Sequence, residues 1–125
     1  MNCLLKAVVT MASEKLFENK LKRWLESEGI YPFGTPKNKM TVAPCGYWEK
    51  RFGGGNFSKN GLPDMHIVVN GKSVECELKG PKGKPSELQK FMINQINESG
   101  GIGVILYPSD FEMFKNLILD LKGGK

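Results

Sequence analysis

The sequence has no long apolar run and few of the residues that build disulfide or zinc frameworks. No stretch of its 125 residues approaches the roughly 20 apolar residues of a membrane span, and the first twelve residues are too short for a secretion signal. Cys3, Cys45 and Cys76 are odd in number and follow no CxxC or Cys/His spacing, which argues against disulfides and against a zinc site. We therefore expect a cytoplasmic protein with no membrane partner.

Signs of a second domain, and of elements that read DNA bases, are also missing. The chain has no internal repeat, linker, low-complexity tract, helix-turn-helix or zinc-finger pattern, and its length suits one hydrophobic core. We expect a short flexible or strand-like leader over residues 1–12 and a single domain over residues 13–125. A nucleic acid bound by such a chain should be recognised by its shape rather than by its sequence.

Positive charge is in excess. The 18 lysines and arginines outnumber the 13 acidic residues, and the formal net charge is +5. A basic balance favours an anionic partner such as nucleic acid, since neutralising phosphates releases counter-ions. Charge alone does not decide the matter, because many basic proteins bind no nucleic acid.

Apolar spacing predicts an α/β protein in the order helix, strand, strand, strand, helix, strand, helix. The expected elements are a helix over residues 13–28 ended by Gly29, a strand over 47–52, two strands on either side of 70–71, a helix opened by Pro85 with Leu88, Phe91, Met92 and Ile96 on one face, a strand over 102–107, and a last helix through Phe111 and Leu121. These elements suit a central mixed sheet flanked by helices.

The most informative segment is the pair of strands around Asn70-Gly71, a dipeptide typical of a type I′ hairpin turn. With these two residues as the loop, Asp64 lies directly opposite Glu77, and Lys79 shares their face. The other face is entirely apolar: Met65, Ile67, Val69, Val74, Cys76 and Leu78. Like charges opposite each other in a sheet repel, so the acid pair calls for a counter-ion, and a divalent cation would serve.

Two carboxylates and an amine on one face suit metal-assisted hydrolysis of a phosphodiester. Mg²⁺ or Mn²⁺ takes few carboxylates and keeps several waters, and the backbone carbonyl of Leu78 is a natural further ligand between Glu77 and Lys79. Lys79 could orient a water molecule or offset charge on the phosphorus. The alternative is a solvated sheet face on which these residues are ordinary surface charges.

A longer set of motifs resembles the PD-(D/E)xK nuclease signature, and in particular the short, stand-alone phage-type members of the VRR-NUC family. The matching strings are Ser13-Glu14-Lys15 with Phe17-Glu18-Asn19-Lys20, then Lys59-Asn60-Gly61-Leu62-Pro63-Asp64, then Glu75-Cys76-Glu77-Leu78-Lys79-Gly80, then Gly83-Lys84-Pro85-Ser86-Glu87-Leu88-Gln89, and the Gly100-Gly101 break. They extend from about Ser13 to Asp120. The short Pro-Asp and Glu-x-Lys pieces are weak motifs, but their order and spacing here are more specific.

The resemblance implies a restriction-endonuclease-like core and a set of roles. Asp64 and Glu77 would be metal ligands, Lys79 the catalytic lysine and Gln89 a supporting residue. Glu18 would be the acid of the first helix that completes the metal site. Glu14 is a rival for that role, although it could simply interact with the helix N-terminus, and Gln89 could equally be a polar residue at the edge of the core.

Basic residues adjoin both ends of the expected site and could contact phosphates. They are Lys50, Arg51 and Lys59 around a glycine run, and Lys82 and Lys84 in the loop after the motif. Aromatic residues interleaved with the first group, Tyr47, Trp48, Phe52 and Phe57, permit base stacking, although burial of at least two is expected. His66, the single histidine, is best interpreted as a cross-strand partner of Glu75.

The activity that the resemblance implies is Mg²⁺- or Mn²⁺-dependent endonucleolytic cleavage of DNA, selective for branched structures such as junctions or flaps. We expect a homodimer, since cutting two strands takes two sites, whose interface uses the leader or the aromatic loop segment, and no small-molecule substrate. One alternative is a binding module that keeps the fold and only holds nucleic acid. Another is a sequence-specific restriction-type nuclease, which the lack of an insertion large enough to read base edges disfavours.

Overall fold

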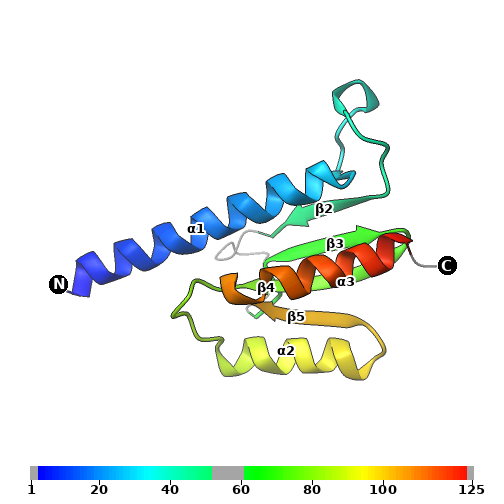
Figure 1. Cartoon of the computed structure of the whole chain (residues 1–125). Coiled ribbons are helices and arrows are strands. Elements are labelled where there is room, and N and C mark those ends of the chain that lie inside the picture. Colours follow the sequence, from blue (N-terminus) through cyan, green and yellow to red (C-terminus); the bar gives the residue numbers. More distant parts are fainter. Residues whose placement is uncertain (1–2, 52–60, 124–125) are drawn as a thin grey trace.

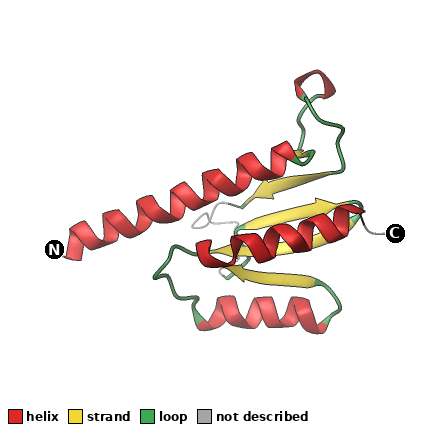
Figure 2. Ribbon diagram, in the orientation of Figure 1, coloured by secondary structure: helices red, strands yellow, loops and turns green. Residues whose placement is uncertain are grey.

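The computed structural model describes residues 3–51 and 61–123, with the side chains of all of these except 6–11. The elements, in chain order, are α1 (Cys3–Ser27), β1 (Ile30–Pro32), the 3₁₀ helix η1 (Lys37–Lys39), β2 (Gly46–Lys50), β3 (Met65–Val69), β4 (Lys72–Leu78), α2 (Glu87–Glu98), β5 (Ile102–Leu106), the 3₁₀ helix η2 (Pro108–Asp110) and α3 (Phe111–Gly123). Figure 1 shows their arrangement and Figure 2 the helices around the sheet. None of the described helices is long and apolar enough to span a membrane.

The described strands form one mixed sheet in the order β1-β2-β3-β4-β5. β1 is parallel to β2 and β4 is parallel to β5, whereas β2, β3 and β4 are antiparallel neighbours. An α/β protein with a central mixed sheet is therefore confirmed. The sheet has one strand more than expected, because the short β1 lies in a proline-containing segment for which no strand was predicted.

The central hairpin forms in the predicted register. Val69 pairs with Lys72 and His66 pairs with Glu75. Asn70 and Gly71 both have positive φ, 52° and 80°, as a type I′ turn requires. This register directs the apolar residues of β3 and β4 to one face and the charged residues to the other.

The apolar face is covered by α1 and α3, which contact each other through Phe17 and Phe111, with ring centroids 5.6 Å apart. The hydrophobic core joins these two helices to the six buried residues of the hairpin, Met65, Ile67, Val69, Val74, Cys76 and Leu78. On the opposite face, α2 packs on β5, where the backbone of Ile93 approaches Gly103 closely enough that a Cβ would lie 3.1 Å from the Ile93 carbonyl oxygen. Helices therefore cover both faces.

The prediction of a flexible or strand-like leader is wrong. The first helix begins at Cys3 rather than after Ser13, and no glycine or proline interrupts the chain before Gly29. Gly29 has positive φ and follows the helix end as expected. The predicted helix opened by Pro85 is α2; Leu88 and Phe91 are exposed on it, and its buried residue is Ile93.

Candidate functional site

The two acids of the hairpin meet at the end of the sheet where β3 begins and β4 ends. Asp64 directly precedes β3, and its Oδ2 accepts a hydrogen bond from the backbone N–H of Leu78 at 2.9 Å. The negative charge of Asp64 acts directly on Glu77, so the two carboxylates lie close together. The predicted acid pair is therefore present, on the face opposite the hydrophobic core.

Glu77 is the more enclosed member of the pair. It is 2% exposed, and its Oε2 lies 3.5 Å from Lys79 Nζ and accepts a hydrogen bond from Gln89 Nε2 at 3.2 Å. Its Oε1 is buried and has no hydrogen-bond partner among the described residues. Burial, followed by the negative charge of Asp64, raises the pKa of Glu77 to about 8, although Lys79 acts in the opposite direction.

Gln89 reaches Glu77 because it also shapes the start of α2. Its backbone N–H donates to the Ser86 hydroxyl at 3.1 Å, and its Oε1 accepts from the Ser86 N–H at 2.9 Å, which together form a capping box. The remaining Nε2 donor is thereby directed at Glu77. Gln89 therefore contacts Glu77 and also caps the start of α2.

Lys79 extends the end of β4 toward the loop that leads to α2. Its backbone N–H donates to the Leu106 carbonyl at 3.0 Å, which continues the pairing of β4 with β5. Its side chain is 15% exposed and passes the loop at Gly83, where a Cβ would lie 3.3 Å from Lys79 Cδ. The ammonium group is therefore held near Glu77 by both strand and loop.

The donor set fits a small, hard cation. Two adjacent carboxylates supply oxygen ligands, and one of these oxygens, Glu77 Oε1, is buried without a hydrogen-bond partner among the described residues. Mg²⁺ commonly takes one or two carboxylates together with water and phosphate oxygens. Among the described residues, no three His, Cys, Asp or Glu side chains come together as a metal-binding group. The site would thus hold a metal through Asp64 and Glu77, with the backbone of Leu78 beside them.

Glu18 is not brought to this pair. It lies on α1, which covers the opposite face of the sheet, and is 5% exposed. Its carboxylate is bound by three ammonium groups: Lys22 at 2.8 Å, Lys15 at 3.0 Å, and Lys50 of β2. Burial tends to raise the pKa of Glu18, but hydrogen bonds from these lysines outweigh it and lower the pKa to about 2. Glu14, the rival acid, is half-buried on the same helix.

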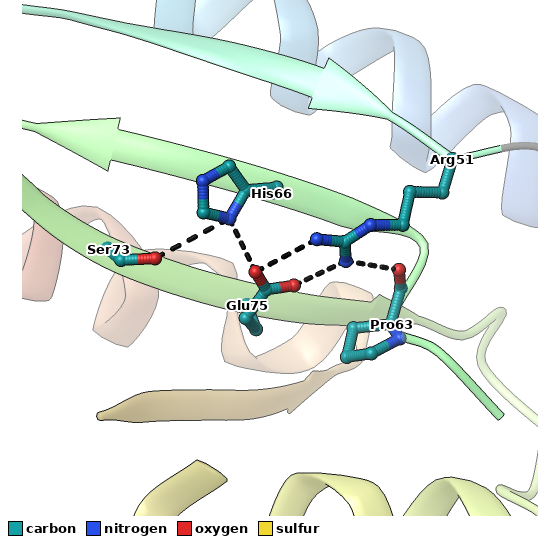
Figure 3. Close-up of polar contacts among 5 residues, drawn as sticks. All are labelled: Arg51, Pro63, His66, Ser73 and Glu75. Atoms are coloured by element: carbon teal, nitrogen blue, oxygen red, sulfur yellow. Dashed lines mark hydrogen bonds and ion pairs between the residues drawn. The ribbon is translucent and has the colours of Figure 1, made fainter. Parts of the chain in front are cut away.

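A second polar network occupies the same sheet face as the acid pair (Figure 3). Arg51 donates to Glu75 through both terminal nitrogens and to the Pro63 carbonyl at 3.0 Å, and Glu75 also contacts His66 Nδ1. The cross-strand pairing of His66 with Glu75 is thus confirmed. The backbone N–H of Arg51 donates to the carbonyl of Asp64 at 2.6 Å, so this network fixes the chain next to the acid pair.

The basic residues expected to contact phosphates fall into three groups. Lys50 and Arg51 are engaged in the ion pairs just described, whereas Lys82 and Lys84 are exposed in the loop after β4. Lys59 lies outside the described residues, as do Phe52 and Phe57. Of the other two aromatic residues, Trp48 is buried and Tyr47 half-buried.

An apolar hollow of about 250 Å³ lies elsewhere, lined by residues of β5 and α3 that include Val104, Leu106, Met113 and Phe114. No residue of the acid pair lines it, and its lining is apolar apart from Asp110.

Comparison of the chain with family models, with curated protein sequences and with solved structures found no match. Function is therefore inferred from the geometry of the acid pair and its neighbours.

Proposed function

We propose that the protein is a divalent-metal-dependent DNA endonuclease, a VRR-NUC-like member of the PD-(D/E)xK superfamily with a restriction-endonuclease-like core, acting in the cytoplasm. The observation that carries the proposal is the arrangement around Glu77: a buried carboxylate next to Asp64, with one oxygen unpartnered and the other near Lys79 and Gln89. A divalent ion bound there supplies Lewis-acid polarisation of the scissile phosphate and lowers the pKa of a bound water.

The chain's own residues have separate tasks in this proposal. Asp64 and Glu77 hold the ion, and Gln89 keeps the Glu77 carboxylate oriented. Lys79 places a positive charge where it can orient the attacking water or stabilise the phosphorane-like transition state. The exposed Lys82 and Lys84 contact phosphates to one side of the cleaved bond.

Branched DNA is the proposed substrate, as the resemblance to the VRR-NUC family implies. The sequence has no motif typical of elements that read base edges, and its net positive charge favours backbone contacts. Cleavage of two strands takes two sites, which a homodimer would provide. A sequence-specific restriction-type activity is disfavoured because the sequence has no insertion large enough to read base edges.

A plasmid-nicking assay with Mg²⁺, Mn²⁺ or EDTA tests the proposal, followed by synthetic junctions, flaps and linear duplexes. Wild type should nick only with a divalent ion, and Asp64→Asn and Lys79→Ala should lose cleavage while still binding DNA. Lys90→Ala is a matched control, because Lys90 is an exposed lysine paired only locally, with Glu87. If wild type binds DNA but leaves every form intact with either metal, the chain is the alternative, a nucleic-acid-binding module.

A further inference from the structure

The lysines around Glu18 carry more positive charge than its single carboxylate can neutralise. Lys15, Lys22 and Lys50, which we term the lysine cluster, all place their ammonium groups on this carboxylate. Three positive charges against one negative charge leave a surplus of two. Ammonium groups held this close repel one another, so the arrangement favours a further anion.

The lysine cluster is partly sheltered from water. The side chains of Lys22 and Lys50 are 23% and 20% exposed, whereas Lys15 is 63% exposed. Lys22 Nζ also lies 5.3 Å from the centre of the Trp48 ring. Partial burial weakens screening by salt and water, so an anion that docks here interacts more strongly than it would with isolated surface lysines.

The position of Lys50 links the cluster to the acid pair. Lys50 is the last residue of β2 and pairs with Met65, the residue after Asp64. The next residue, Arg51, donates its N–H to the Asp64 carbonyl. The cluster and the acid pair therefore lie at the same end of the sheet, the cluster on the α1 face and the pair on the α2 face.

We propose that the lysine cluster is a phosphate-binding subsite for the DNA backbone beside the cleaved bond. A strand that crosses this end of the sheet with one phosphate at Asp64 and Glu77 carries its neighbouring phosphates past Lys50. One or two phosphodiesters would offset the surplus of two positive charges. This inference rests on the proposed DNA substrate, but it concerns binding and needs no metal.

The test is binding of the full-length chain to a fluorescently labelled DNA duplex in EDTA, measured by anisotropy over a range of salt concentrations. Lys15→Gln/Lys22→Gln should weaken binding roughly tenfold at moderate salt. It should also make the slope of log K against log salt less negative by about 1.8, since each lost phosphate contact changes that slope by about 0.9. Circular dichroism melting checks that the variant is folded.

A matched control removes two positive charges outside the lysine cluster. Lys39→Gln/Lys72→Gln changes exposed residues in η1 and beside the hairpin turn, and that turn is at the end of β3 and β4 opposite the acid pair. Its salt slope should change by less than half as much. Equal changes in the two double variants would overturn the proposal, because net charge alone would then explain them.

Two further outcomes separate this proposal from the nuclease itself. Lys15→Gln alone alters a side chain that is 63% exposed, and the slope of log K against log salt should become less negative by about 0.9. Circular dichroism melting checks its fold, and an unchanged slope in the folded variant overturns the subsite. If the cluster variants bind DNA more weakly but wild type cleaves no DNA with Mg²⁺ or Mn²⁺, the phosphate-binding subsite is supported and the proposed nuclease activity is contradicted. If wild type cleaves DNA and the double variant binds DNA as well as wild type does, only the subsite proposal is contradicted.

Discussion

Glu77 and Glu18 are the two buried charged residues in the part of the chain whose burial is described, at 2% and 5% exposure, yet their pKa values differ widely. Burial acts in the same direction on both and raises the pKa. Asp64 adds to this effect at Glu77, where the pKa is about 8, whereas three lysines reverse it at Glu18, where the pKa is about 2. The charges of the neighbouring residues, not the depth of burial, cause this difference in pKa. Glu77 with Asp64 has an excess of negative charge, whereas Glu18 with three lysines has an excess of positive charge.

The largest expected effect is on DNA cleavage and comes from removing the carboxylate of Glu77. Glu77→Gln keeps the size of the side chain but loses half of the acid pair, so metal-dependent nicking should fall by roughly 10³-fold or more. Single-turnover cleavage of a saturating substrate measures the loss. Glu49→Gln, an exposed acid on β2, is the control; equal activity of both variants would show that Glu77 is not part of the chemistry.

The second prediction concerns stability without metal. Because the folded-state pKa of Glu77 is raised from 4.5 to about 8, the folded protein binds this proton more tightly than the unfolded chain. The resulting stability is complete below about pH 4.5 and is lost as pH rises toward 8. Urea unfolding in EDTA should show a decrease of a few kcal/mol between about pH 5 and 8.

Two comparisons sharpen this result. Mg²⁺ should oppose the decrease, since it binds the ionised pair of the folded state only. Glu77→Gln should be at least as stable as wild type at pH 8 in EDTA and should lack the decrease. A wild-type stability that rises over this pH range would contradict the assignment.

Glu18 should behave in the opposite sense. Its folded-state pKa is lowered from 4.5 to about 2, so its stabilisation is present above about pH 4.5 and is lost as pH falls through 2. Glu18→Gln should therefore lower the free energy of unfolding at neutral pH by up to about 3 kcal/mol, and the difference should vanish near pH 2. Glu14→Gln, on the same helix, is the matched control and should change stability little.

The smallest expected effect is at Gln89. Gln89→Ala removes one half of the capping box and the hydrogen bond to Glu77, so stability should fall by about 1 kcal/mol and cleavage by roughly 10- to 100-fold. Gln95→Ala, an exposed glutamine of the same helix, should leave cleavage unchanged. A variant of Gln89 that loses stability but keeps full activity would reduce its role to helix capping.

The hairpin could be predicted because its rules are local. A two-residue turn sets the register, and alternation along each strand then places Asp64 and Glu77 on one face. The surroundings of Glu18 could not be predicted, because its contact with Lys50 joins residues 32 positions apart and depends on how α1 packs against β2. Arg51 was expected to contact phosphate for a similar reason: nothing in the local sequence shows that Glu75 binds it.

The first turn of α2 has a consequence for how the candidate site fails. Because Gln89 both closes that turn and binds Glu77, fraying of the helix start and release of the carboxylate are a single event. Conditions that melt only this turn, well short of global unfolding, should therefore already abolish the proposed nuclease activity. Amide hydrogen exchange at Ser86 and Gln89 would report that local opening directly.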